Sequence, residues 1–158
     1  MGKRQEIADK LKERIELVTT ANGYTQDVKT VTYDDIRINI DEWKDWELPA
    51  VQIIDLAGIY NHEISRSRTI WNLGIECIMR STASGQIGQT DLWNFMEDVT
   101  RSVMANPKLD LSYVQHVKLS DHQTDIHTVA PNHIGILGWQ VWFYEPMTRT
   151  IVTGKRPP

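Results

Sequence analysis

One stretch of this chain alternates strictly, and it constrains the fold more than any other feature. Between residues 69 and 79 every second residue is apolar or packable: Thr69, Trp71, Leu73, Ile75, Cys77 and Met79. A period of two is typical of a β-strand with one buried face. A polar, glycine-containing break follows at residues 81–89. An amphipathic helix is then predicted from apolar residues at helical spacing: Leu92, Phe95, Met96, Val99 and Val103.

The remaining segments predict further elements on both sides of this pair. A first helix is expected at residues 3–21, with one apolar stripe and an Asn-Gly stop. Strands are expected near residues 27–32, at 50–55 and at 67–81, with a turn or hairpin at 58–66. Alternating isoleucines at residues 36–40 allow another short strand. The second helix is expected at about residues 90–105, with Thr90 or Asp91 as its N-cap. Two or three strands, near residues 112–119, 123–129 and 135–145, complete the chain.

These elements predict a single α+β domain over residues 1–146. Its mixed, mainly antiparallel sheet is expected to pack against two main α-helices, and residues 147–158 form a polar C-terminal tail. A chain of 158 residues is long enough to bury one core without disulfides or metals. The predicted core combines the helical stripes with the strand faces: Leu11, Ile15, Val51, Ile53, Leu73, Ile75, Phe95 and Val99.

Composition indicates the compartment of synthesis. The charged N-terminus lacks the apolar core of a signal peptide, and no apolar run is long enough for a membrane helix. The single cysteine cannot form an intrachain disulfide. The sequence therefore predicts synthesis in a reducing cytoplasm and no membrane partner.

Charge is distributed unevenly along the chain, although the formal net charge is only −4. Residues 31–60 contain seven acids and two bases, whereas the charged residues after Glu145 are all basic: Arg149, Lys155 and Arg156. A dedicated nucleic-acid binder needs clustered Lys and Arg, so this pattern disfavours that class. Two interpretations remain open. Either the clusters are solvated surface and a loose tail, or acidic and basic patches meet between copies.

Sites for catalysis, cofactors or metals are not predicted. The late histidines, His116, His122, His127 and His133, match no zinc-ligand spacing. The alternating register of Cys77 predicts an inert core thiol. Residues 84–88 precede a helix, but they lack the lysine of a phosphate-binding loop and the glycine spacing of a dinucleotide fingerprint. The chain is therefore not expected to be an enzyme or to hold a cofactor.

Tryptophan placement leaves two interpretations open. Trp139 and Trp142 are three residues apart on one predicted strand, so their side chains point to opposite faces of the sheet. Such a strand is either buried on both sides or lies against another subunit, where tryptophan is enriched.

The order of several sequence blocks resembles the tail terminator proteins of long-tailed bacteriophages, the lambda-like tail terminator family. A first helix ends at Asn-Gly-Tyr, and the strand LPAVQIID follows at residues 48–55. IECIMRST stands at residues 75–82, and LWNFMEDVTRSVMANPKL at residues 92–109. The strand GILGWQVWFYEP then leads into a short Arg/Lys/Pro tail. The acidic residues 41–47 have no counterpart in this resemblance.

The resemblance implies a structural virion protein rather than an enzyme. It implies a hexameric ring that caps the tail tube, stops its polymerisation and joins the tail to the head-side connector or stopper. The implied partners are other copies and the major tail tube protein, and DNA passes through the lumen without specific binding. The implied location is the neck region of the virion tail, after assembly in the host cytoplasm. Candidate interface residues are the acidic cluster, two tryptophans and the basic tail: Asp41, Glu42, Trp43, Asp45, Trp46, Glu47, Trp139, Trp142, Arg149, Lys155 and Arg156.

Two alternatives remain open. One is another head–tail joining or tail-completion protein of a phage neck, which shares small size and ring assembly. The other is an enzyme or small-molecule-binding domain with a pocket between the sheet and the helices. That alternative requires convergent polar groups in an apolar cleft, which sequence spacing does not indicate.

Overall fold

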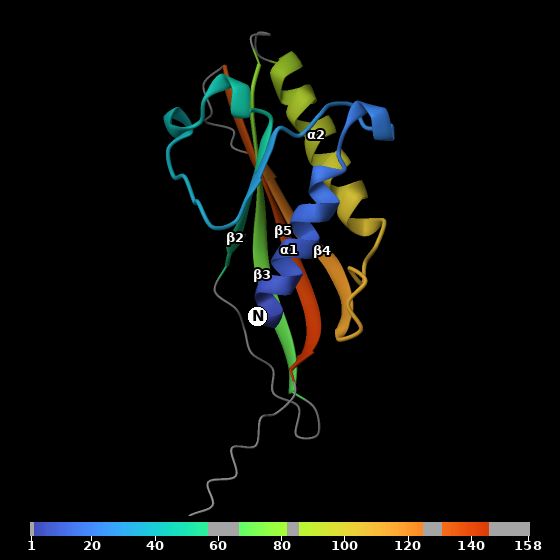
Figure 1. Ribbon diagram of the computed structural model, residues 1–158. Coiled ribbons are helices and arrows are strands. Elements are labelled where there is room, and N and C mark those ends of the chain that lie inside the picture. Colours follow the sequence, from blue (N-terminus) through green and yellow to red (C-terminus); the bar gives the residue numbers. More distant parts are fainter. Residues whose placement is uncertain (1, 57–66, 82–85, 125–130, 146–158) are drawn as a thin grey trace, which may run out of the picture.

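The computed structural model describes residues 2–56, 67–81, 86–124 and 131–145. The elements follow in this order: α1 (Lys3–Glu16), β1 (Thr30–Thr32), β2 (Ala50–Asp55), β3 (Ser67–Arg80), α2 (Gln86–Met104), β4 (Val114–Thr124) and β5 (Asn132–Glu145). The 5-stranded sheet has the order β1-β2-β3-β5-β4, with β1 and β2 parallel and the other described neighbours antiparallel. Both helices lie against one face of the sheet (Figure 1). The predicted α+β class is confirmed.

The two long strands β3 and β5 form the centre of the sheet. They pair without interruption from Ser67 opposite Glu145 to Arg80 opposite Asn132. Because side chains alternate across a strand, the odd-numbered residues of β3 share one face. That face is buried under the helices, and Leu73, Ile75 and Cys77 are each 0% exposed. The face predicted from the alternating stretch is therefore confirmed.

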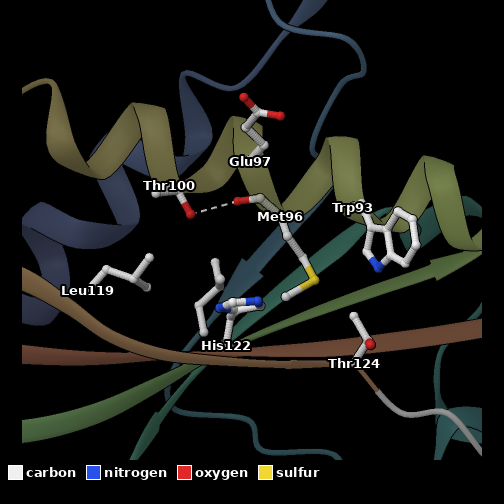
Figure 2. Close-up of a pocket in the computed structure, with 8 residues that line it drawn as sticks. Trp93, Met96, Glu97, Thr100, Leu119, His122 and Thr124 are labelled. Atoms are coloured by element: carbon white, nitrogen blue, oxygen red, sulfur yellow. Dashed lines mark hydrogen bonds between the residues drawn. The ribbon is translucent and has the colours of Figure 1, made fainter.

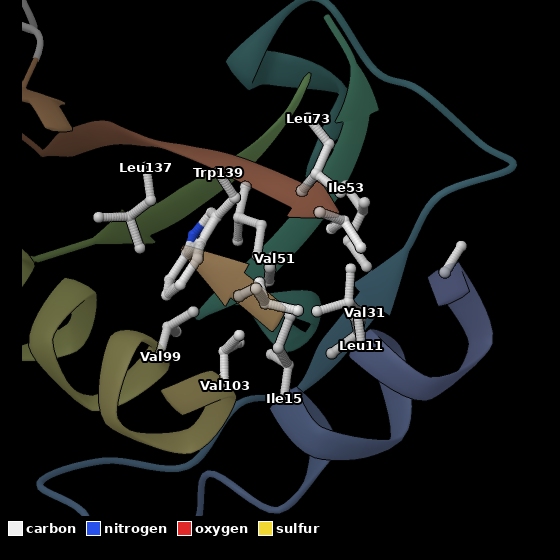
Figure 3. Packing of buried hydrophobic residues seen from close by; sticks show 14 of the residues in the cluster. Leu11, Ile15, Val31, Val51, Ile53, Leu73, Val99, Val103, Leu137 and Trp139 are labelled. Atoms are coloured by element: carbon white, nitrogen blue, oxygen red, sulfur yellow. The ribbon is translucent and has the colours of Figure 1, made fainter. Parts of the chain in front are cut away.

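The core lies between this sheet face and the two helices. All eight residues predicted for the core belong to one buried cluster. Figure 3 shows Leu11 and Ile15 of α1 beside Val99 and Val103 of α2, opposite strand residues such as Val51. The helices are also joined by polar contacts, because Arg14 Nε donates to the backbone oxygen of Ser102 at 3.3 Å and the Ser102 hydroxyl donates to that of Arg14.

Both helix boundaries differ from the prediction. α1 ends at Glu16, and a 3₁₀ turn at Thr20–Asn22 follows, closed by Gly23 with a φ of 85°. α2 begins at Gln86, so Thr90 and Asp91 lie inside it rather than capping it. The extra turn packs closely on β5, since a Cβ at Gly88 would lie 2.2 Å from Nε2 of His133. This tertiary contact extends the helix into a segment whose polar and glycine residues argue for a loop.

The strand boundaries also differ from the prediction. The strands expected at residues 112–119 and 123–129 are one strand, β4, as far as the structure describes them. Register irregularities after Val114 and after Leu119 shift its alternation, which explains the misreading. β1 begins at Thr30 rather than residue 27, β5 begins at Asn132 rather than residue 135, and residues 36–40 form no strand. The turn at 58–66, the end of the strand predicted at 123–129 and the tail at 147–158 lie outside the described residues.

We expect the side chain of Phe95 to be a main determinant of stability. It is 0% exposed, whereas Trp93 on the same helix is 51% exposed. Phe95→Ala should lower the free energy of unfolding by about 3–5 kcal/mol, because it removes buried apolar surface and leaves a cavity. Trp93→Ala is the control and should cost much less. Urea unfolding followed by circular dichroism measures both, and equal losses would contradict the assigned orientation of α2.

Candidate functional site

The most distinctive surface of the domain is the acidic segment, defined as residues 34–47. It connects β1 to β2 and includes 3₁₀ turns at Ile40–Glu42 and Asp45–Glu47. Trp43, which is 2% exposed, packs with Leu48, Ala50 and Ile78 in a second hydrophobic cluster. Ile78 and Ala50 pair across β2 and β3 on the face opposite the helices. The acidic segment therefore covers part of the helix-free face, beside the upper ends of β2 and β3 in Figure 1.

Arg37 holds the acidic segment in shape from within. Its Nη1 lies 2.8 Å from Oε2 of Glu47, and its Nη2 lies 3.1 Å from Oδ2 of Asp35. The guanidinium also lies 4.4 Å from the centre of the Trp43 ring. The buried amide of Gln52 on β2 exchanges hydrogen bonds with the backbone of Arg37, at 2.8 Å and 3.3 Å. These contacts join the segment to the sheet.

A second arginine clamps the other end of the segment. Arg80, at the end of β3, forms an ion pair with Asp45 and donates to the backbone oxygen of Trp43 at 3.5 Å. Its Nε donates to Asn132 Oδ1 at 2.8 Å, which orients the guanidinium. The acidic segment is thus attached to three strands, β2, β3 and β5.

The carboxylate of Glu47 is the buried acid of this segment. Its Oε2 accepts a hydrogen bond from the backbone N–H of Lys44 at 2.9 Å and another from Nη1 of Arg37 at 2.8 Å. The hydrogen bond from Lys44, followed by the one from Arg37, holds the pKa of Glu47 below its usual value. The charged form of Glu47 therefore stabilises the folded segment.

The outer side of the acidic segment exposes apolar side chains among carboxylates. Ile38 is 90% exposed and Trp46 is 73% exposed. The acids around them are exposed as well: Asp34, Asp35, Asp41, Glu42 and Asp45. An exposed apolar group of this size on an anchored segment is typical of an interaction surface.

The candidate interface residues fall into separate places. Asp41, Glu42, Asp45 and Trp46 are exposed on the acidic segment, but Trp43 and Glu47 are buried beneath it. Trp139 is 1% exposed and belongs to the core, so its side chain is not available at a surface. Arg149, Lys155 and Arg156 lie outside the described residues. The pairing of the acidic segment with the C-terminal tail stays a prediction.

Trp142 lies on the helix-free face, as the three-residue spacing from Trp139 predicts. Its ring is stacked with His116 at a centroid distance of 5.2 Å, and the guanidinium of Arg68 lies 5.3 Å from its centre. Ile70 pairs with Trp142 on the same face, and Lys118 follows beside Gln140. We call Arg68, Ile70, His116, Lys118 and Trp142 the basic-aromatic patch. Sequence reasoning did not identify it, because its members come from three strands.

A pocket of about 440 Å³ lies on the opposite side, between α2 and the strands β4 and β5. Trp93, Met96, Leu119 and Leu137 give it an apolar lining, and His122 and Thr124 add polar groups (Figure 2). The Thr100 hydroxyl at its edge donates to the backbone oxygen of Met96 at 2.8 Å, so its proton is already used. Sequence spacing did not indicate this convergence, because the polar residues come from different elements.

The other titratable groups do not form a second site within the described ranges. No group of three or more His, Cys, Asp or Glu residues that could hold a metal is found among them. Cys77 is fully buried as predicted, and burial raises the pKa of its thiol. His116 and His122 lie on opposite faces of β4, and His133 packs on Gly88. In the described part of the chain, no helix is long and apolar enough to span a membrane.

Comparison with known proteins adds no family assignment: no protein-family model and no curated protein sequence matches this chain.

The low pKa of Glu47 predicts a pH dependence for the acidic segment. Because the folded-state pKa is depressed, the stabilisation is complete above the usual carboxyl pKa and disappears as the pH falls through the lowered value. Glu47→Gln should lower the unfolding temperature at pH 7, and the difference from the wild type should shrink at pH 3. Glu42→Gln, at an exposed carboxylate, is the control. A Glu47→Gln deficit that is equal at both pH values would contradict a role for the charge.

Proposed function

We propose that this chain is a structural virion protein, a bacteriophage tail terminator. In this proposal it forms a hexameric ring on the last ring of the tail tube, stops tube polymerisation and joins the tail to the head-side connector. The proposal rests on the resemblance of the sequence blocks and on the surface chemistry of the domain. It places the protein in the neck of the tail, after assembly in the host cytoplasm.

The observation that carries the proposal is the two-sided sheet. One face is covered by α1 and α2, whereas the other presents half-buried apolar side chains, including Ile54, Ile70, Ile136 and Trp142. Ile38 and Trp46 are exposed beside that face. Apolar groups gathered on one side of a small domain are typical of a protein that associates through that side.

The charge distribution also supports assembly. A ring is built from heterologous contacts, in which one patch of a subunit meets a different patch of the next. The domain carries an acidic segment and a basic-aromatic patch at different places, as such contacts require. A chain of net charge −4 also suits a lumen through which DNA moves without binding.

Two other functions are alternatives to this proposal. Another neck or tail-completion protein would use the same surface chemistry with different neighbouring rings. A small-molecule-binding or enzymatic domain is favoured by the pocket between α2 and β4, whose volume of about 440 Å³ lies in the range of ligand sites. Its lining combines four apolar side chains with Glu97, Thr100, His122 and Thr124, which suits a ligand with both apolar and polar groups.

Negative-stain imaging of the full chain, alone and with purified tail tubes, tests the proposal. We expect rings with a central hole, and tubes that carry a cap at one end and no longer elongate. Tubes without the protein are the control. Particles without a hole, together with tubes that elongate normally, would contradict the terminator function.

Native mass spectrometry separates assembly from ligand binding. For the assembly function, we expect ions of the bare chain and of its multiples. A bound molecule of a few hundred daltons that Trp93→Ala removes would instead favour the binding function, because Trp93 lines the pocket. Lys108→Glu, at an exposed residue outside that lining, is the matched control.

A further inference from the structure

We propose that the acidic segment of one copy docks on the basic-aromatic patch of a second copy of this chain. The inference rests on the proposed ring function and extends it, because it names the surfaces through which neighbouring subunits meet. All the residues that define the two surfaces are among those that the structure describes, and neither surface includes the C-terminal tail.

The first argument is charge. The acidic segment carries six acidic side chains and two basic ones, and five of its acids are exposed. Among the described bases, Arg37 and Arg80 are engaged with this segment in the same chain. Asp41 and Glu42 are exposed, as are Trp46 and Ile38 of the same segment. The segment thus presents apolar side chains together with carboxylates, which favours a basic and aromatic partner surface.

The second argument is the chemistry of the patch. On the helix-free face, Arg68 and His116 flank the Trp142 ring on its two sides, and Ile70 pairs with Trp142. Lys118 lies one row further along β4 and is exposed. The acid of this face on β4, Asp121, lies in the row beyond Lys118, opposite Gly138. The patch is therefore aromatic, and the exposed Lys118 at its rim supplies a positive charge that complements the acidic segment.

The third argument is a hollow beside the patch. Gly138 of β5 faces Gly74 of β3, and the side chains of Ile54 and Leu56 lie over Gly74. A hollow of about 380 Å³ lies beside Gly138, and its lining combines Leu56, Ile136 and Asn72 with the polar residues Ser120, Asp121 and Gln123. The hollow is large enough to admit a tryptophan side chain. An aromatic anchor in a central pocket with charged groups at the rim is the usual arrangement of an interface hot spot.

The fourth argument is distance. The acidic segment packs over Ile78, and the patch is centred on Ile70, eight residues earlier on the same strand. At about 3.4 Å per residue, the two positions are roughly 27 Å apart. The two surfaces therefore cannot contact each other within one chain, and only a second copy can bring them together. Because they occupy opposite ends of one face, the contact joins non-identical patches.

Reversal of charge tests this contact directly. We expect the full chain to self-associate in sedimentation velocity over a concentration series, and more weakly at high salt because the charges are screened. Asp41→Lys with Glu42→Lys should weaken association at least tenfold, and Lys118→Glu should do the same. The combination of all three should recover most of the loss, because the pair is restored with opposite signs. Trp46→Ala should weaken association at any salt concentration.

Matched controls are available at exposed charges outside both surfaces. Lys108→Glu changes the same residue type as Lys118→Glu, and Glu16→Lys reverses an acid on α1. Both should leave association unchanged, and circular dichroism verifies that every variant is folded. The proposal is overturned if the wild type stays monomeric over the whole series, if the controls weaken association equally, or if the combined variant does not recover.

The mass of the assembly separates this inference from the ring function. Recovery by the combined variant with a mass of two chains supports the contact and contradicts the ring. If rings form in negative stain and neither Asp41→Lys with Glu42→Lys nor Lys118→Glu affects them, the ring is supported and the contact is overturned. Recovery with rings supports both.

Discussion

The continuous antiparallel pairing of β3 with β5 is the constraint on which the other features of this domain depend. Fourteen residues of β3 are paired from Ser67 to Arg80 without a bulge, so every side chain on both strands has an assigned face. A shift of the register by one residue would move Leu73 and Trp139 from the core to the opposite side. The ladder thus directs the core side chains to one face of the sheet and the side chains that alternate with them to the other face.

The rest of the chain covers the two faces of the sheet to different extents. α1 and α2 cover the face of Leu73 and Trp139 completely, whereas the acidic segment covers only the end of the other face near Ile78. A hollow beside Gly138 lies in the middle of that face, and the basic-aromatic patch occupies the far end. This partial cover is the basis of the proposed contact between copies.

Sequence alone predicted the parts of the fold that repeat with a clear period. The alternation of residues 69–79 and the helical stripes identified the core correctly, because burial of one face is recorded in the order of residues. The start of α2 was missed because it depends on a close contact between Gly88 and His133, which are distant in the chain. β4 was read as two strands because its irregularities shift the alternation.

The candidate site was predicted less well than the core, for a related reason. Composition marked the acidic cluster, but it did not separate the buried Trp43 and Glu47 from the exposed Asp41 and Trp46. That division depends on Arg37 and Gln52, whose bonds cross from one element to another. The basic-aromatic patch was not recognised, because Arg68, His116 and Trp142 become neighbours only in the sheet. Surfaces assembled across strands leave no local pattern.

The way in which the acidic segment is held also bears on how it associates. An irregular segment that orders only on binding would lose conformational entropy at that moment, which weakens the complex. Here Trp43 is buried against the sheet, Glu47 is hydrogen-bonded to Arg37 and Lys44, and Asp45 is paired with Arg80 within the single chain. Ile38 and Trp46 are therefore exposed on a backbone that is already fixed. Part of the cost of ordering is met during folding, which favours the proposed contact between copies.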